Sequence, residues 1–343
     1  MPDLPRPKQL ATAVKKAAEE EGVTERRFRR WVAVSALIEV FNIARAQTRL
    51  PEFLVKGGFA LECRYRSLAR SSRDVDIVLG VGKQELIDAA VEAMRMDWSG
   101  FTFRIKGEPE EREHSYKFEV NSVYLESDWS TFEVELVAGE VVEPEMLKPH
   151  PVDALGLTRP SDVPCMNVYE QIAQKIHAVT DPSEERPRDL LDIFLLERQL
   201  ELDDSALRGA SEKTFRERAT HEWPPTIELR DGWSATIEEL LRRNKLPFSV
   251  DQILDAVRAL MVRMLGVSLK MNYRYHFVVL SAKGRVPNVN ESALMDDEGY
   301  AALQRMTEQE GWRLVQVIDY PSSERTHAML AILEKPIPST EEN

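Results

Sequence analysis

The stretch of residues 53–80, FLVKGGFALECRYRSLARSSRDVDIVLG, determines how we interpret the rest of the chain. A short apolar run at residues 53–55 is followed by the pair Gly57-Gly58 and by helical spacing over residues 59–69. A second strand-like run begins at Asp74. The pattern predicts a strand, a glycine turn, a helix and a second strand.

Asp74 and Asp76 lie two residues apart in the second predicted strand, so their side chains share one face. Adjacent carboxylates repel each other unless a cation lies between them. Mg²⁺ prefers oxygen ligands and commonly binds nucleotide phosphates, so the D-x-D pattern suits a magnesium site. Taken alone, the same pattern also fits solvated charge at a strand edge, and the glycine pair fits an ordinary tight turn.

Together the two patterns resemble motif I of the AbiEii/AbiGii toxin family, which has a nucleotidyltransferase fold. The resemblance is carried by K-G-G-x-A-L at residues 56–61 and by S-x-D-x-D-hydrophobic at residues 72–77. One position differs. The family usually has serine or threonine where this chain has Phe59, so the hydroxyl expected near the nucleotide phosphates is missing.

The resemblance implies an α+β fold, with a small mixed sheet of the polymerase-β-like nucleotidyltransferase type and a helical C-terminal half. We expect three parts. Residues 1–150 form the nucleotidyltransferase core with N-terminal helices, and residues 151–268 form a helical domain that completes the active-site cleft. Residues 269–343 form a small α+β accessory module of the β-α-β-β kind, with a helix at residues 293–309 and a disordered tail from residue 336.

Composition limits the classes of protein to which the chain can belong. With 343 residues, 43% of them hydrophobic, it is long enough for two or three domains. No apolar run approaches the roughly 20 residues of a membrane span, and the polar N-terminus lacks the apolar core of a signal peptide. Cys63 and Cys165 have no metal-ligand spacing. We therefore expect a cytoplasmic protein that does not enter a membrane.

Charge is distributed unevenly along the chain. The net charge of −13 argues against broad affinity for nucleic acid. Between Glu25 and Arg73, however, eleven basic residues face four acidic ones, a local charge of +7 that leaves −20 for the remainder. A basic segment leading into an acidic strand suits an enzyme that acts on a polyanion. For residues 26–30 alone, a solvated helix face explains the charge equally well.

A third carboxylate is predicted in the strand-like run of residues 132–137. Its apolar residues alternate with Glu133 and Glu135, which therefore share a face. The resemblance implies that a neighbouring strand supplies a third metal ligand, and Glu135 fits the family pattern best. Glu133 is the alternative, and a solvent-facing strand would explain both residues without any metal.

Two further motifs lie on predicted helices that follow a proline-rich connection at residues 138–165. E-x-x-A-x-K-x-H-A at residues 170–178 is similar to the second family motif, whose lysine, here Lys175, is expected to contact the triphosphate. A lysine beside an apolar stripe more often extends to water. His177 alone fits a structural role.

R-x-R-D-x-x-D at residues 186–192 resembles the third family motif. Pro187 suits the first helical position and Asp189 suits the first turn, where it interacts favourably with the helix dipole. The resemblance implies that Asp189 orients Lys175 or the acceptor hydroxyl. Arg188 and Asp192 are assigned structural support, with Asp192 anchoring an arginine.

The resemblance thus implies transfer of a nucleotide from an NTP to an acceptor hydroxyl, with a tRNA 3′ end as the expected acceptor and an antitoxin as the expected partner. Asp74, Asp76 and Glu135 would hold Mg²⁺ or Mn²⁺. The expected nucleotide-binding residues are Lys56, Gly57, Gly58, Arg73 and Lys175. The alternatives are an enzyme of this fold that modifies a protein or small molecule, a kinase-like toxin, and an inactive binding module, which Phe59 favours.

Overall fold

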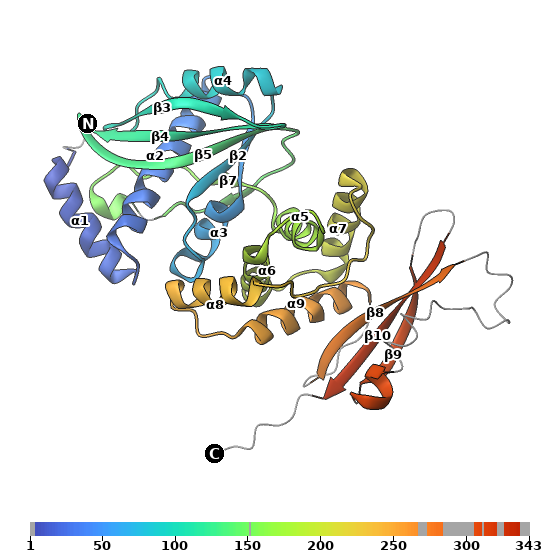
Figure 1. The fold of residues 1–343 in the computed structure, drawn as a ribbon. Coiled ribbons are helices and arrows are strands. Elements are labelled where there is room, and N and C mark those ends of the chain that lie inside the picture. The colour runs from blue at the N-terminus through green and yellow to red at the C-terminus, as the bar shows by residue number, and fades with distance from the viewer. Residues whose placement is uncertain are drawn as a thin grey trace, which may run out of the picture. The chain divides into compact units, whose positions relative to one another are not determined.

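The computed structural model describes residues 4–150, 152–266, 273–283, 305–310, 312–320 and 326–336. The chain forms two compact units, residues 1–171 and residues 172–343 (Figure 1). The first unit is built around a sheet, and the second is helical up to residue 264, so the fold is α+β as predicted.

The sheet of the first unit has seven strands in the order β3-β4-β5-β2-β1-β7-β6. It is mixed: β2 runs parallel to β5, and β1 runs parallel to β7 but antiparallel to β2. The strands are β1 Phe53–Lys56, β2 Asp74–Leu79, β3 Phe101–Glu111, β4 Ser115–Tyr124, β5 Ser127–Ala138, β6 Glu145–Leu147 and β7 Val163–Cys165. The sequence predicts strands at residues 101–106, 116–125 and 132–137, and all three are present. The first and third are longer than predicted, and β4 is shifted by one residue.

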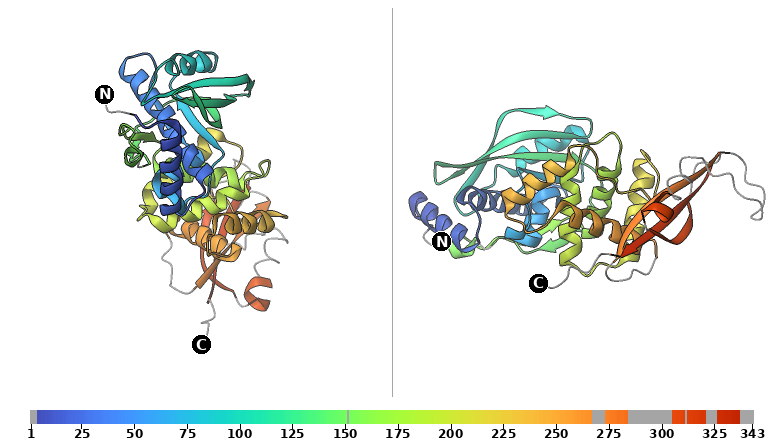
Figure 2. Two further views of the ribbon diagram at one scale, coloured as in Figure 1. Left: turned by 90° about the vertical axis from the view of Figure 1, so that its left-hand side faces the viewer. Right: turned by 60° about the horizontal axis from the view of Figure 1, so that its bottom comes forward.

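Helices cover one face of this sheet. Two of them, α2 (Glu25–Ala46) and α4 (Leu86–Ala93), pack on β3, β4 and β5 (Figures 1 and 2). The first helix, α1 (Pro7–Glu20), packs against α2. The sequence predicts that Thr24 caps this helix, and its hydroxyl accepts a hydrogen bond from the backbone N–H of Arg27 at 3.2 Å. The buried side chains of α2 and of the strands form one continuous core.

The helix of the opening motif, α3, spans Gly57–Tyr65 and is shorter than the predicted 59–69. It begins at Gly57 itself, so no separate turn follows β1. Arg27 and Arg30 of α2 both pair with the fully buried Glu62 of α3, at 2.8 and 2.7 Å. These two arginines, which we considered for a polyanion-binding segment, therefore hold α2 against α3.

The proline-rich connection contributes to the sheet, which the sequence did not predict. Two three-residue strands, β6 and β7, lie within it and extend the sheet beyond β1. Val55 of β1 pairs with Cys165 of β7. Strands this short carry too few alternating residues to be recognised among prolines.

The second unit begins within α5, and four further α-helices follow among its described residues. The sequence predicts that helices begin at Asp204, Gly232 and Val250, and α7, α8 and α9 each begin within a residue of these positions. The helix α6 begins at Pro187, as its motif predicts. The bounds are α5 Val168–Thr180, α6 Pro187–Gln199, α7 Asp204–Arg218, α8 Trp233–Asn244 and α9 Val250–Met264. Among the described residues, no helix combines the length and the apolar character needed to cross a membrane.

A three-stranded antiparallel sheet follows in the order β8-β10-β9 (Figure 1). Its strands are β8 Tyr273–Lys283, β9 Arg313–Tyr320 and β10 Thr326–Pro336. Of the helix predicted for residues 293–309, only the last five positions are described, as a single π-helical turn, Arg305–Gln309. Residues 293–304 and the predicted disordered tail beyond residue 336 lie outside the described residues.

Candidate active site

Four carboxylates lie on one face of β2 and β5. In the parallel register, Asp74 pairs with Glu133 and Asp76 pairs with Glu135, and all four are half-buried. Val75 and the other apolar residues that alternate with these acids on the two strands are buried in the core. Because paired residues of neighbouring strands share a face, the acids lie on the side opposite the core that contains α2 and α4.

Position 57 requires glycine because it lies directly against Asp76. Its φ of +66° is a conformation that L side chains rarely adopt, and an added Cβ would lie 1.8 Å from Asp76 Oδ2. The carbonyl oxygen of Gly57 accepts a hydrogen bond from Gln171 Nε2 at 2.8 Å. Lys56 lies opposite Asp76 in the antiparallel register of β1 and β2. The K-G-G motif and the D-x-D motif are therefore in direct contact.

Gly58 makes a similar close approach to Ser72. A Cβ at Gly58 would lie 2.4 Å from Ser72 Oγ, which in turn lies 3.0 Å from Asp74 O and 3.1 Å from Asp74 Oδ1. Ser72 is buried, so this hydroxyl fixes the backbone and the carboxylate of Asp74 together. The sequence interpretation gave Ser72 no role, although its place two residues before D-x-D is a usable signal. Arg73, between them, is exposed.

Phe59, the residue that departs from the family pattern, lies in the core. Its ring meets His150 edge to face at 5.9 Å, and His150 stacks on Trp31 at 4.0 Å. Burial, and then the nearby arginines, lower the pKa of His150 to about 3. The side chain at position 59 therefore contributes to packing on the helix-covered side.

Strand β4 and the turn between β3 and β4 supply partners for the two glutamates, which the sequence did not predict. Ser115 Oγ donates to Glu135 Oε1 at 2.7 Å, and Arg112 Nη1 lies 3.3 Å from Glu135 Oε2. Lys117 Nζ lies 3.1 Å from Glu133 Oε2. The antiparallel register places Lys117 opposite Glu135, so its side chain lies on the carboxylate face and extends diagonally to Glu133.

The carboxylate face fits a hard divalent cation. Its donors are carboxylate oxygens from two hydrogen-bonded strands, which is the ligand chemistry that Mg²⁺ and Mn²⁺ prefer. Asp74 is held by Ser72, and Asp76 lies against the bare Cα of Gly57, so both aspartates are positioned by the protein itself. Glu133 and Glu135 are equally well placed by register, and each already has a basic neighbour.

The second and third motifs meet within the second unit. Lys175 Nζ lies 2.5 Å from Asp189 Oδ1 and 2.7 Å from Asp192 Oδ2, and the lysine side chain is only 10% exposed. Lys175 therefore does not extend to bulk water. The contact with Asp189 agrees with its predicted orienting role, whereas Asp192 also binds the lysine, a partner that we had not assigned to it. The functional roles of Lys175, Asp189, Arg188 and Asp192 stay predictions.

Known proteins provide an independent comparison. The family described as "Nucleotidyl transferase AbiEii toxin, Type IV TA system" matches residues 43–265. Among solved structures, MenT4, a nucleotidyltransferase toxin from Mycobacterium tuberculosis H37Rv, is similar with a TM-score of 0.47 and 15% identity, over 75% of this chain and 98% of that one. JHP933 from Helicobacter pylori is similar with a TM-score of 0.40 and 15% identity, over 71% of this chain and 91% of that one. No curated protein matches the sequence.

Proposed function

The chain belongs to the AbiEii family of nucleotidyltransferase toxins, and from this premise we propose that it transfers a nucleotide from an NTP to a tRNA 3′ end at the carboxylate face of β2 and β5. Membership makes it a nucleotidyltransferase enzyme of a toxin–antitoxin system. The tRNA acceptor, the cation and the residue roles are the proposal.

The observation that carries the proposal is the register of β2 and β5. It aligns the D-x-D acids with Glu133 and Glu135 on the face opposite the core. An ordinary solvated strand would not need the two close glycine contacts, in which Asp76 lies against Gly57 and Ser72 against Gly58. These contacts restrict how the aspartates can move, and a site that binds a cation depends on such restriction.

In the proposed reaction, the acceptor hydroxyl attacks the α-phosphorus, the bond to the β-phosphate oxygen breaks and pyrophosphate leaves. Asp74, Asp76 and Glu135 would hold Mg²⁺ or Mn²⁺, which would neutralise phosphate charge and lower the pKa of the acceptor hydroxyl. The backbone at Gly57 and Gly58 leaves room for phosphate because neither residue has a side chain.

Basic side chains would complete phosphate binding. Lys56, opposite Asp76, and the exposed Arg73 are the candidates in the first unit. Lys175, which the family motif assigns to the triphosphate, is a further candidate, and Asp189 would hold its ammonium group in place. An antitoxin encoded beside the chain is the expected partner, because uncontrolled modification of tRNA would stop growth.

The test uses each of the four NTPs, labelled at the α-phosphate, with the full-length chain, Mg²⁺ and total tRNA. We expect label on tRNA with the wild type and none with Asp76→Ala. Transfer of a γ-phosphate label instead would indicate a kinase-like toxin. Transfer of the α-label to a protein or small molecule would indicate a different acceptor, and no transfer to any acceptor would indicate a binding module.

Growth provides a second readout. Induction of the wild-type chain should arrest growth, whereas induction of Asp76→Ala at the same protein level should not. Equal toxicity of the two chains would contradict catalysis at the carboxylate face.

A further inference from the structure

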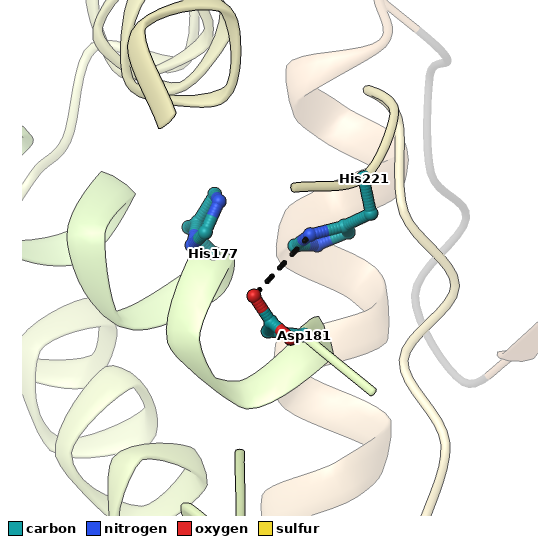
Figure 3. A group of neighbouring side chains, drawn as sticks. All are labelled: His177, Asp181 and His221. Atoms are coloured by element: carbon teal, nitrogen blue, oxygen red, sulfur yellow. Dashed lines mark ion pairs between the residues drawn. The ribbon is translucent and has the colours of Figure 1, made fainter. Parts of the chain in front are cut away.

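Three potential metal ligands, none of them assigned a role in the proposed reaction, converge in the second unit. His177 and Asp181 lie one helical turn apart at the end of α5, and His221 lies in the segment after α7 (Figure 3). One ligand atom from each residue lies within 4.8 Å of the other two. We call these residues the histidine cluster. The sequence interpretation treated His177 as structural and overlooked the H-x-x-x-D spacing, which places both side chains on one helix face.

The ligand atoms surround a single point. The hydroxyl of Thr220 occupies it, at 3.1 Å from His177 Nε2, 2.8 Å from Asp181 Oδ2 and 3.0 Å from His221 Nδ1. A hydroxyl has one proton and can donate to only one of these atoms. A cation at this point would displace the hydroxyl of Thr220, an exposed residue.

The outer atoms of two ligands are already held by neighbouring residues. Asp181 Oδ1 accepts hydrogen bonds from the N–H and the hydroxyl of Ser183 at 2.9 and 2.6 Å, which leaves Oδ2 facing the point. His221 Nε2 lies 2.8 Å from Thr180 Oγ1, which leaves Nδ1 facing the point. Such outer partners are typical of metal-binding carboxylates and histidines, because they fix the orientation of the ligand.

The protonation states also favour metal binding. Burial is the largest cause that lowers the pKa of His177, to about 4, and it lowers the pKa of His221 as well. The hydrogen bonds from Ser183 are the main cause that lowers the pKa of Asp181. Neutral imidazole and ionised carboxylate are the forms that bind a metal. In addition, His177 is almost fully buried and its other ring nitrogen, Nδ1, has no hydrogen-bond partner.

Charged residues of both signs surround the histidine cluster, and one of them is hydrogen-bonded to the backbone. Arg218 and Arg230 lie close enough to affect the histidines, and Glu184 opposes them. Arg230 donates to the carbonyl oxygens of Asp181 at 2.6 Å and of Glu184 at 2.7 Å. Its guanidinium therefore fixes the loop that carries Asp181, which pre-positions this ligand.

We propose that His177, Asp181 and His221 bind a borderline divalent transition metal of the zinc type, which ties the last turn of α5 to the segment after α7. Two imidazole nitrogens and one carboxylate oxygen match the ligands of tetrahedral zinc, with water in the fourth position. His221 is 16% exposed and gives water access. Zinc bonds of about 2.0–2.1 Å require the ligand atoms to lie roughly 3.4 Å apart, so binding draws the cluster together. The proposal does not rest on the proposed function.

The test is calorimetric titration of Zn²⁺ into the full-length chain after treatment with a chelator, in the presence of excess Mg²⁺. We expect one zinc per chain and a rise in melting temperature on binding. Co²⁺ should give the visible absorption of a tetrahedral site. Asp181→Asn and His221→Gln keep similar shapes and should each weaken zinc binding by about 100-fold or more.

Three variants serve as controls. His114→Gln removes an exposed histidine, and Asp76→Ala removes an acid of the carboxylate face, so both should bind zinc like the wild type. Thr220→Ala should keep zinc binding, because it removes the hydroxyl but no ligand. Absence of stoichiometric binding by the wild type, or unchanged affinity in Asp181→Asn and His221→Gln, would overturn the proposal. So would a Thr220→Ala chain that is destabilised and binds no zinc, because the cluster would then be only a hydrogen-bond network.

Discussion

The carboxylate face of the first unit and the histidine cluster of the second differ in their ligand atoms and in the elements that carry them. The carboxylate face presents four half-buried acids on two strands, and only oxygen ligands are available there. The histidine cluster lies at the end of a helix, combines nitrogen with oxygen, and two of its three ligands are buried. Hard cations prefer the first set of ligands and borderline cations the second, so we expect the two sites to select different metals.

The strongest test of this comparison removes the D-x-D acid that contacts Gly57. Asp76→Asn should lower the rate of nucleotidyl transfer by about 1000-fold or more, because the metal interaction contributes several kcal/mol to the transition state. Zinc affinity should not change. Glu119→Gln, on β4 and paired in register with Glu133, is the matched control and should stay active. Similar losses in both variants would mean that the acids act only through the general charge of the sheet.

Gly57→Ala tests whether close packing positions the carboxylate face. The new Cβ would overlap Asp76 Oδ2 in a backbone conformation that alanine rarely adopts. We expect the free energy of unfolding to fall by about 2–4 kcal/mol, with loss of activity. Gly107→Ala is the control, because Gly107 also has positive φ but no neighbour within 4 Å. It should lose about 1 kcal/mol in urea denaturation. Equal effects would show that backbone strain alone is responsible.

A smaller effect should separate the two glutamates of β5. Glu135→Gln should lower activity by about 100-fold, and Glu133→Gln by less than about tenfold, if Glu135 is the third metal ligand. The two residues lie two positions apart on the same face of β5, so each is a control for the other. Measuring rates over a range of Mg²⁺ concentrations distinguishes loss of cation binding from loss of turnover. A larger loss of activity in Glu133→Gln than in Glu135→Gln would assign the ligand role to Glu133.

The smallest predicted effect concerns His150, a buried histidine that, unlike those of the histidine cluster, has no hydrogen-bond partner for either ring nitrogen. Its folded pKa of about 3 lies below the unfolded value, so the unfolded chain binds the proton first as pH falls. Its contribution to stability is complete above about pH 6.5 and should fall by about 2 kcal/mol between pH 8 and pH 5.

Urea denaturation of the wild type and of His150→Leu at both pH values measures this effect. The loss between the two pH values should be about 2 kcal/mol smaller in the variant, since leucine has no proton to gain. Equal losses in the two chains would show that His150 does not control this pH dependence.

Much of the fold was predictable because its signals are local. The helix cap at Thr24, the first-turn proline of α6 and the alternation in β5 each depend on residues a few positions apart. The short strands β6 and β7 were missed because nothing within three residues distinguishes them from a proline-rich loop. The extension of β3 past residue 106 was missed because its alternation is interrupted there, where the register with β4 shifts.

The sequence by itself determined the family and the shared strand face of the D-x-D acids, because these follow from spacing within a motif. Only the tertiary structure decided that Asp76 lies on the Cα of Gly57, that Ser115 and Arg112 contact Glu135, and that His221 joins His177 and Asp181. The physical reason is that strand register and helix packing bring distant residues together. No local pattern of side chains encodes which distant residue fills a given space.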